Sequence, residues 1–251
     1  MSTLPTIDII IPNFNKAKYL EQCLKSVIDQ TYKNWKVYLV DDKSTDGSIE
    51  ILNKFKNIDN INIFLLEQNK GPSHCRNLGI KNSNSDFITF LDSDDYWPQD
   101  KLEKQLSVML KNSYYFTYTD FQFFYNDNES EVKKTNLPNF FDYKSFTLHS
   151  TMSTSSIMLK RSFLKKNLFQ NVDHEDYLFK CDLLRNGDLA FKIKETYVYY
   201  RINNTNRSSS KIKNIINLWN INKKKNNLSF FSNLKSLVFI SLNSLIKYGW
   251  K

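Results

Sequence analysis

Residues 87–95 read Phe-Ile-Thr-Phe-Leu-Asp-Ser-Asp-Asp, an apolar run that ends in a cluster of carboxylates. A short run of this kind is typical of a buried strand. The strand would present Asp92, Asp94 and Asp95 side by side where it ends. Hard divalent cations prefer oxygen ligands and often share them with substrate phosphates. We therefore expect Asp92 and Asp94 to hold Mg²⁺ or Mn²⁺, with a solvated turn of helix-capping aspartates as the alternative.

Upstream of this stretch, strand patterns alternate with helix patterns. Within 18–30, for example, apolar residues recur at the spacing of one helix face. Strands are expected at 7–11, 36–40, 61–66 and 87–91, and helices at 18–30, 48–55, 72–81 and 98–111, with Ser48 as the cap of the second helix. Such alternation predicts βαβ units and a mostly parallel, Rossmann-like sheet flanked by helices, which is an α/β fold.

Polar clusters directly follow three of the expected strands. They are the residues at 12–15, the pair Asp41-Asp42 and the residues at 92–95. In open parallel sheets, ligands bind beyond the carboxyl ends of the strands. The three clusters therefore predict a nucleotide site along one edge of the sheet.

Beyond residue 111 the pattern becomes aromatic and less regular. We expect a polar loop at 126–130, a strand at 152–159 and a helix at 177–185 closed by Asn186-Gly187. The expected organisation is a catalytic domain over 1–207, with a nucleotide-binding half at about 1–100 and an acceptor half at about 101–207. Residues 208–251 would form a basic amphipathic helical tail.

The charge of the chain is concentrated near its C-terminal end. The net charge is +9, yet residues 196–251 alone carry ten Lys and Arg and no Asp or Glu, so the body is close to neutral. A near-neutral body argues against a nucleic-acid partner. Lysines and apolar residues interleave in the tail, which favours an anionic membrane surface as a partner. A helix packed on the domain with a solvated lysine face is the alternative.

Cysteine usage and the apolar runs bear on location. The three cysteines are far apart and form no Cys-x-x-Cys pair, so neither a zinc ribbon nor a disulfide framework is indicated. The N-terminal stretch does not read as a signal peptide. The run at 237–246 is too short and too polar to span a bilayer. We expect a cytoplasmic protein, with a peripheral position on the inner face of the membrane as a further expectation.

Five stretches in order carry a resemblance to a known family. They are Ile-Ile-Ile-Pro-Asn-Phe-Asn at 9–15, Val-Asp-Asp-Lys-Ser-Thr-Asp-Gly-Ser at 40–48, Asn-Lys-Gly-Pro-Ser-His-Cys-Arg-Asn-Leu-Gly at 69–79, Phe-Leu-Asp-Ser-Asp-Asp at 90–95 and His-Glu-Asp at 174–176. The sequence resembles a family 2 glycosyltransferase of the GT-A fold, of the inverting type that builds bacterial surface polysaccharides and lipo-oligosaccharides. The resemblance covers roughly residues 5–205.

The resemblance implies a set of donor-binding residues. Asp42 would accept a hydrogen bond from the nucleotide base, most often uracil, and we expect it to face an open crevice, so that its loss would not unfold the domain. The other donor-site residues would be Pro12, Phe14, Asn15, Gly71, Arg76 and Ser93. Phe14 offers a stacking face, with a core aromatic as its alternative. Gly71 permits a close backbone approach, and Arg76 offers a planar fork suited to phosphate.

On the acceptor side, the resemblance implies that Asp176 is the general base and that Glu175 contacts the acceptor or its neighbours. Without the resemblance, two acidic residues at the start of a helix are well explained by its dipole. The further supporting residues would be Asp95, Trp97 and Arg201. The family often carries His where Asn203 stands, so Arg201 or Arg207 would substitute in that phosphate contact, with a surface turn as the alternative for this loop.

The function expected from these residues is inverting, metal-dependent transfer of a sugar from a nucleotide diphosphate, most often a UDP-sugar, to a hydroxyl of a glycan or glycolipid. A sugar nucleotidyltransferase is one alternative, although such enzymes usually carry a glycine-rich loop after the first strand, and residues 12–16 contain no glycine. A non-catalytic membrane- or nucleic-acid-binding protein acting through the tail is another. That alternative leaves the strand-end aspartates unexplained.

Overall fold

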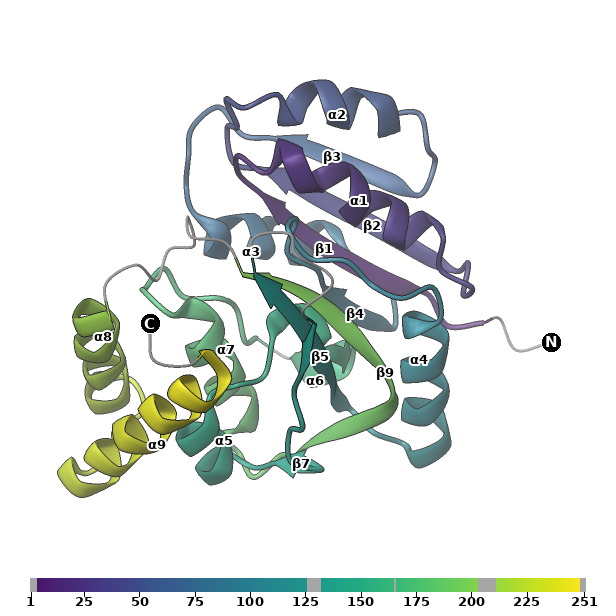
Figure 1. Cartoon of the computed structure of the whole chain (residues 1–251). Coiled ribbons are helices and arrows are strands. Elements are labelled where there is room, and N and C mark those ends of the chain that lie inside the picture. Colours follow the sequence, from purple (N-terminus) through teal and green to yellow (C-terminus); the bar gives the residue numbers. More distant parts are fainter. Residues whose placement is uncertain (1–3, 126–131, 165, 203–210, 249–251) are drawn as a thin grey trace.

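The computed structural model describes residues 4–125, 132–164, 166–202 and 211–248. One sheet runs through both halves of the chain, in the order β3-β2-β1-β4-β8-β5-β9-β7, with β6 paired to β5 (Figure 1). The order reverses direction between β1 and β4. In α/β sheets this reversal is where ligands bind.

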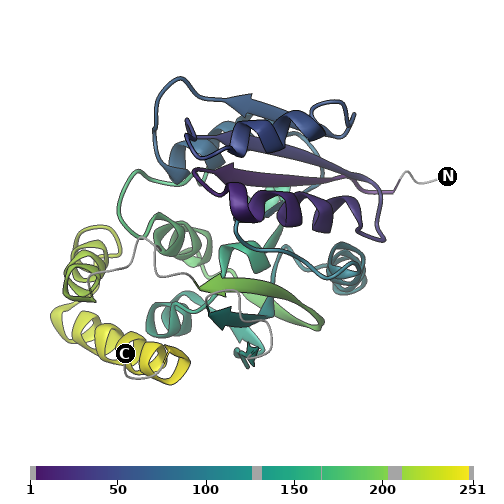
Figure 2. The same ribbon diagram turned by 45° about the horizontal axis from the view of Figure 1, so that its top comes forward.

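The N-terminal half is a parallel βαβ arrangement, as the sequence predicts. Its strands are β1 (Ile7–Asn13), β2 (Trp35–Asp41), β3 (Ile61–Leu65) and β4 (Phe87–Phe90), all parallel to their neighbours within this half. Its helices are α1 (Ala17–Ile28), α2 (Ser48–Phe55) and α3 (Pro72–Asn82). Figure 2 shows α1 and α2 on one face of these strands and α3 on the other. Right-handed crossovers produce this distribution when the strand order reverses.

The second half extends the sheet with mixed pairing. After α4 (Lys101–Asn112), its strands are β5 (Phe116–Tyr125), β6 (Lys133–Lys134), β7 (Phe140–Phe141), β8 (Met158–Lys160) and β9 (Ala190–Ile202). Its helices are α5 (Tyr143–His149), α6 (Arg161–Leu164) and α7 (Glu175–Leu184). Strand β8 lies antiparallel between β4 and β5, whereas β5 and β9 are parallel. The α7 helix matches the expected helix closely. The loop expected at 126–130 lies outside the described residues.

Two local expectations are wrong. The strand expected at 152–159 is confined to its end, because Thr154–Ser156 form a 3₁₀ turn in which the Ser156 hydroxyl donates to the Ser153 carbonyl. Ser48 does not cap α2. The cap position is Gly47, at φ +90°, and Asp46 instead accepts hydrogen bonds from the Ser48 amide and hydroxyl. Asp46 thus serves the first turn of α2 from outside the helix.

Helix α3 packs closely on β1 because of one glycine. A Cβ atom at Gly79 would lie 2.7 Å from Cγ2 of Ile10, which is closer than side chains tolerate. Arg76 lies one helical turn earlier on the same side of α3. The close packing at Gly79 therefore sets how near Arg76 comes to the end of β4.

The C-terminal residues form α8 (Lys211–Lys224) and α9 (Phe230–Tyr248), which lie together at one edge of the molecule (Figures 1 and 2). Hydrogen bonds join them to the domain: Tyr177 donates to Asn222, Asn222 to Ser236, and Ser236 to the Thr147 carbonyl. The tail therefore packs on the domain. Among the described residues, no helix has the length and apolarity needed to cross a bilayer.

At the amino end of β1, a buried ion pair connects the two halves. Asp8 is fully buried and accepts hydrogen bonds from the amide and hydroxyl of Ser85 at 2.6 and 2.7 Å. It also pairs with Arg161, at the start of α6, at 2.9 Å. A buried acceptor with this many partners is costly to remove.

We predict that Asp8→Ala lowers the free energy of unfolding by about 2–4 kcal/mol, because Arg161 and Ser85 lose their shared acceptor. Urea denaturation measures the change. Asp59→Ala, at an exposed position before β3, is the matched control and should leave stability within about 0.5 kcal/mol. Equal stability of the two variants would contradict a structural role for the Asp8 network.

Candidate functional site

The loops after β1 and β2 are tied to each other. The Asn13 side chain donates a hydrogen bond to Asp41 at 2.7 Å. The Asn15 side-chain oxygen accepts one from the Thr45 backbone amide at 2.7 Å, and the Asn15 backbone amide donates one to the Ser44 hydroxyl at 2.9 Å. Asn15 lies in the left-handed region, at φ +52°. The Asn15 side chain thus braces the two loops.

The other two residues of the first cluster border this edge of the sheet. Phe14 is 44% exposed, so the core-aromatic alternative is wrong and its ring is free to stack on a ligand. Pro12, the next-to-last residue of β1, is partly buried. The sequence-predicted residues 12–15 therefore include one exposed aromatic face and one loop brace.

Asp42 does not face an open crevice. It is 3% exposed, and its two carboxylate oxygens accept the main-chain amides of Lys70 and Gly71 at 2.7 and 2.8 Å. A buried carboxylate that satisfies two backbone N–H groups is part of the structure of the loop. The expectation that Asp42 faces an open crevice is therefore wrong, because Asp42 holds the loop before α3 in place.

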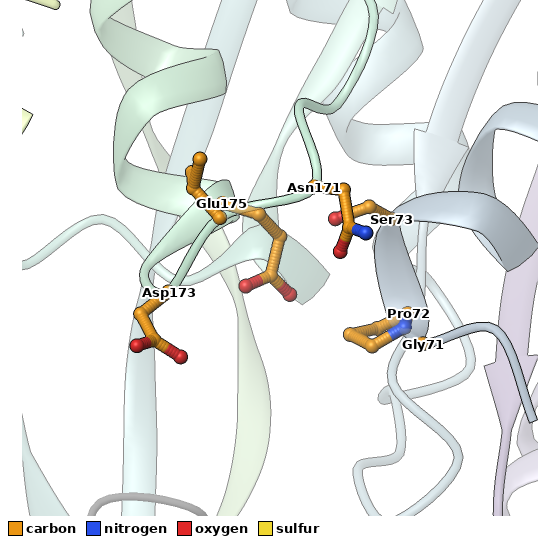
Figure 3. A pocket seen from close by; sticks show the side chains of 7 residues that line it. Gly71, Pro72, Ser73, Asn171, Asp173 and Glu175 are labelled. Carbon is orange, nitrogen blue, oxygen red and sulfur yellow. The ribbon is translucent and has the colours of Figure 1, made fainter.

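The loop that Asp42 holds forms one wall of a cavity. Gly71 lies at φ +85° and lines a cavity of about 370 Å³ together with Pro72, Ser73, Asn171, Val172, Asp173 and Glu175. Figure 3 shows Asp173 and Glu175 on one side and Pro72 and Ser73 on the other. A second hollow, of about 500 Å³, shares Ser73 and Asn171 with the first. The start of α3 and the segment before α7 therefore enclose the space between the two halves.

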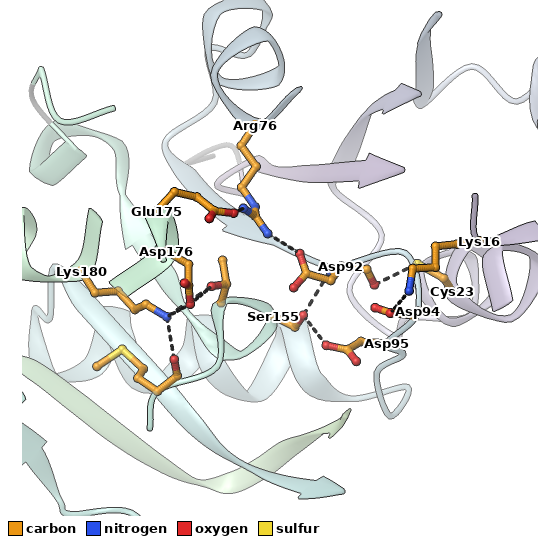
Figure 4. Close-up of polar contacts among 12 residues, drawn as sticks. Lys16, Cys23, Arg76, Asp92, Asp94, Asp95, Ser155, Glu175, Asp176 and Lys180 are labelled. Atoms are coloured by element: carbon orange, nitrogen blue, oxygen red, sulfur yellow. Dashed lines mark hydrogen bonds and ion pairs between the residues drawn. The ribbon is translucent and has the colours of Figure 1, made fainter. Parts of the chain in front are cut away.

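Arg76 connects the two halves at this space. Its guanidinium pairs with Asp92 at 2.7 Å and with Glu175 at 3.0 Å, and it is 5% exposed (Figure 4). Burial opposes the charge of Arg76, but the two carboxylates raise its pKa above its ordinary value. The phosphate-facing fork expected from the sequence is, in this structure, occupied by carboxylates.

The aspartates after β4 differ in their surroundings. Asp94 pairs with Lys16 at 2.6 Å, and its side chain is 16% exposed, against 31% for Asp92. Asp95 is buried and accepts from the Ser155 hydroxyl at 2.6 Å and the Arg201 amide at 3.1 Å. Burial, reinforced by Asp94 and Asp92, raises the pKa of Asp95 well above its usual range. Asp95 thus anchors the loop, whereas Asp92 and Asp94 reach its surface.

Asp92 and Asp94 are the candidate ligands for a divalent metal ion. Within the described part of the chain, no group of three or more His, Cys, Asp or Glu side chains is arranged to hold a metal ion. Asp92 and Asp94 supply hard oxygen donors, and each has a cation beside it, Arg76 or Lys16. Mg²⁺ is commonly bound by one or two carboxylates, with water and substrate phosphates completing its shell. The two donors fit that pattern of shared coordination.

Three other sequence-predicted residues are buried, namely Ser93 within the 92–95 loop and Trp97 and Arg201 beneath it. Ser93 is 4% exposed and Trp97 3% exposed, and the Trp97 indole donates to the Ser155 carbonyl. Arg201 is also buried and donates to the Asp94 carbonyl at 2.9 Å. Trp97 and Arg201 therefore support the loop from below. Asn203 and Arg207 lie outside the described residues.

Asp176 lies in the first turn of α7 and pairs with Lys180 at 2.9 Å. Its side chain is 40% exposed, whereas Lys180 is almost completely buried and also donates to the Met152 carbonyl. Desolvation acts to raise the pKa of Asp176, but the charges of Lys180 and Arg76 lower it more, so the net shift is strongly downward. The Asp176 carboxylate is thus ionised throughout the physiological range.

Sequence reasoning missed three residues of this arrangement: Lys16, Ser155 and Lys180. Lys180 follows Asp176 by four positions on an expected helix, and that spacing was a usable signal. Ser155 donates to Asp95 and contacts the Asp92 amide, and Lys16 pairs across 78 positions. For Lys16 and Ser155 the sequence offers no local signal, because their partners are distant in the chain.

Comparison with known proteins gives a family match. The sequence model described as "Glycosyl transferase family 2" matches residues 8–168. An uncharacterized glycosyltransferase of Haemophilus influenzae is 33% identical over 98% of this chain and 98% of its own length. The Escherichia coli protein WfgD, described as a UDP-Glc:alpha-D-GlcNAc-diphosphoundecaprenol beta-1,3-glucosyltransferase, is 31% identical over 86% of this chain and 84% of its own length.

Solved structures share the fold. TarS 1-349 of S. aureus, in complex with UDP-GlcNAc, superposes with a TM-score of 0.72 at 20% identity, covering 96% of this chain and 73% of that one. The mannosyltransferase PcManGT of Pyrobaculum calidifontis, in complex with GDP-Man and Mn²⁺, gives a TM-score of 0.70 at 14% identity, covering 100% and 77%. The GT-A architecture expected from the sequence is confirmed.

We predict that Asp42→Ala lowers the free energy of unfolding by about 1–3 kcal/mol, because two main-chain N–H groups lose their acceptor. Hydrogen exchange at Lys70 and Gly71 should accelerate. Asp86→Ala, which alters an exposed aspartate, is the control for both measurements. If stability and exchange at these two amides matched those of the control, Asp42 would not be the anchor of the loop.

Proposed function

Because the chain belongs to glycosyl transferase family 2, we propose that it transfers a hexosyl or N-acetylhexosaminyl group from a UDP-sugar to a hydroxyl of a lipid-linked glycan, inverting the anomeric carbon. The observation that carries the proposal is the shared guanidinium of Arg76. It joins Asp92, from the nucleotide-binding half, to Glu175, from the second half, and Glu175 lines the cavity. Family membership also removes the nucleotidyltransferase and non-catalytic alternatives.

Relatives support the choice of substrates. The name of WfgD gives a UDP-Glc donor, an alpha-D-GlcNAc-diphosphoundecaprenol acceptor and a beta-1,3-linked product. The TarS structure holds UDP-GlcNAc. A UDP-sugar donor and an acceptor sugar on a diphosphate lipid are therefore the substrate classes to test first.

The donor would lie along the strand ends of the N-terminal half. Phe14 offers its exposed ring to the base, next to Pro12 and the Asn15 brace. Asp42 shapes the pocket through Lys70 and Gly71, and its carboxylate is also the candidate contact for the base. Ser93 and Arg76 complete the donor side near the diphosphate.

A divalent cation, Mn²⁺ or Mg²⁺, would be held by Asp92 and Asp94 together with the donor diphosphate. When bound, it would supply Lewis-acid stabilisation of the leaving group. Without a cation, the carboxylates of Asp92, Asp94 and Asp95 would repel a diphosphate. In the structure without ligand, Lys16 and Arg76 balance this negative charge.

Asp176 is the candidate general base. A base must be ionised and must reach the acceptor hydroxyl, and Asp176 combines a lowered pKa with a partly exposed carboxylate. Lys180 holds this carboxylate from the buried side. Next to Asp176, Glu175 is fixed by Arg76, lines the first cavity and would position the acceptor.

The direct test is release of nucleoside diphosphate across a panel of UDP-sugars and GDP-mannose, with a synthetic GlcNAc-diphospholipid as acceptor. We predict acceptor-dependent turnover with at least one UDP-sugar, in the presence of Mn²⁺ or Mg²⁺ and abolished by excess EDTA. Full activity in EDTA would rule out the metal role. Absence of turnover with every donor and acceptor of these classes would count against the substrate assignment.

The base role predicts effects of two substitutions. Asp176→Asn should slow turnover by roughly 10²- to 10⁴-fold and leave UDP affinity nearly unchanged. Because Lys180 lowers the pKa of Asp176, the base stays ionised as the pH falls. In Lys180→Met that pKa rises, so the acidic limb of the pH–rate profile should move to higher pH.

Lys104→Met, at a half-exposed lysine on α4, is the control and should leave the profile in place. Circular dichroism and UDP calorimetry on each variant separate misfolding from lost chemistry. Turnover of Asp176→Asn within a few-fold of wild type would remove Asp176 from the mechanism.

A further inference from the structure

Helices α8 and α9 expose apolar side chains on their outer faces. We call the six most exposed of these the tail patch: Ile212, Ile216, Phe230, Phe231, Val238 and Leu242, each between 49% and 80% exposed. Trp219 contacts Phe230, with ring centroids 5.5 Å apart, and so links the outer faces of the two helices. An apolar surface of this kind on a described part of the chain marks a binding surface.

The contact between the tail and the domain contains several buried polar side chains. Asn222 of α8, Asn226 in the turn after α8, and Asn233 and Ser236 of α9 are all at 5% exposure or less. Each takes part in hydrogen bonds, for example from Tyr177 to Asn222 and from Asn233 to the Trp219 carbonyl. A surface helix normally turns its apolar side inward and its polar side to water. Here Leu218 and Ile221 of α8 do pack inward beside the buried amides, yet a second set of large apolar side chains stays outside.

The charge around the patch indicates what covers it. Lys223 and Lys224, at the end of α8, and Lys225, in the turn that follows, are exposed, and the sequence contains no acidic residue after Glu195. Two copies meeting through this surface would bring two patches of the same positive charge into one interface, since an isologous contact uses the same surface of both copies. An anionic bilayer instead accepts apolar side chains and attracts lysines.

The tail is also tied to the cavity. Asn217 of α8 donates to Asp173 at 2.7 Å, and Lys225 donates to Gln170 at 3.0 Å. Asp173 lines the cavity together with Glu175. The outside of α8 is therefore connected, through Asn217 and Asp173, to the wall of the cavity on the acceptor side.

We propose that the tail patch and the Lys223–Lys225 turn seat the enzyme on an anionic membrane, with the helices lying in the interface. This arrangement holds the 170–175 segment beside the membrane, where a lipid-linked acceptor presents its sugar. The second part rests on the function proposed above. The membrane contact itself does not, since it follows from the exposed apolar surface and the lysines.

Vesicle flotation tests the contact without donor or turnover. Wild-type protein should bind anionic vesicles, made of phosphatidylcholine with a mole fraction of about 0.3 phosphatidylglycerol, more tightly than neutral vesicles. Its binding to the anionic vesicles should weaken as the salt concentration rises. Phe231→Ser/Val238→Ser should lower the partition coefficient at least about tenfold. Lys223→Glu/Lys224→Glu should remove the preference for anionic vesicles. Leu65→Ser/Leu110→Ser, at exposed positions on β3 and α4, should match wild type.

Point variants are needed here, because deleting 208–251 would uncover buried partners such as Tyr177. A second readout uses the fact that the three native cysteines are buried. An environment-sensitive dye on Val238→Cys should shift to the blue on anionic vesicles, and the same dye on Leu110→Cys should not. Variants that fold like wild type, judged by thermal melting, complete the comparison.

The proposal is overturned if wild-type protein fails to float with anionic vesicles, or if Phe231→Ser/Val238→Ser floats as wild type does. It is also overturned if sedimentation shows a dimer that the same double substitution dissolves, since a second copy then covers the patch. For the acceptor, Phe231→Ser/Val238→Ser should lose turnover on a vesicle-embedded acceptor and keep it on the same sugar with a water-soluble handle. If neither acceptor is used by wild type, the proposed function fails while the flotation result stands.

Discussion

The guanidinium of Arg76 lies between Asp92 and Glu175, and each of these carboxylates comes from a different half of the molecule. Because Arg76 is almost fully buried, its charge depends on these two partners, since an unpaired buried charge costs several kcal/mol. The site therefore exists as a site only when both halves are folded. The same requirement explains why the cavity borders α3 on one side and the start of α7 on the other.

Around this centre, the charged groups of the site have partners within the protein. Lys16 balances Asp94, Lys180 balances Asp176, and Ser155 and the Arg201 amide satisfy Asp95. A ligand that brings its own charges would exchange these contacts for new ones. The resting structure is thus preorganised by exchangeable ion pairs above a loop that is fixed by buried hydrogen bonds.

The elements up to residue 112 could be predicted from the sequence, because periodicity and strand-end polar clusters are local signals. The sheet order after β4 could not, since β8 consists of three residues and is placed by its neighbours on both sides. The same distinction applies to the site. Asp92, Asp94 and Asp176 follow from short motifs. The pairing of Lys16 with Asp94 joins residues 78 positions apart and emerges only in the folded chain.

Asp42 illustrates a different limit. Its place after β2 was evident, but the sequence did not show that its oxygens would be taken by the Lys70 and Gly71 amides. The sequence alone does not distinguish an aspartate at a strand end that binds a ligand from one that accepts hydrogen bonds from the backbone. The assignment of α8 and α9 had the same ambiguity, since apolar spacing alone does not say which face turns inward.

Gly79 has a mechanical consequence for the charge centre. Helix α3 sets the distance between the sheet and Arg76. At Gly79 the helix has no side chain, and it lies so close to the sheet that even a Cβ atom would clash with Ile10. A single added methyl group would push against Ile10, a core residue with no contact to any substrate, and would lift the helix from the strand. Arg76 is one helical turn from residue 79, so its guanidinium would move by almost the same amount as the helix at residue 79. A chain that changes residue 79 in evolution therefore has to make room at residue 10, and these two positions should vary as a pair.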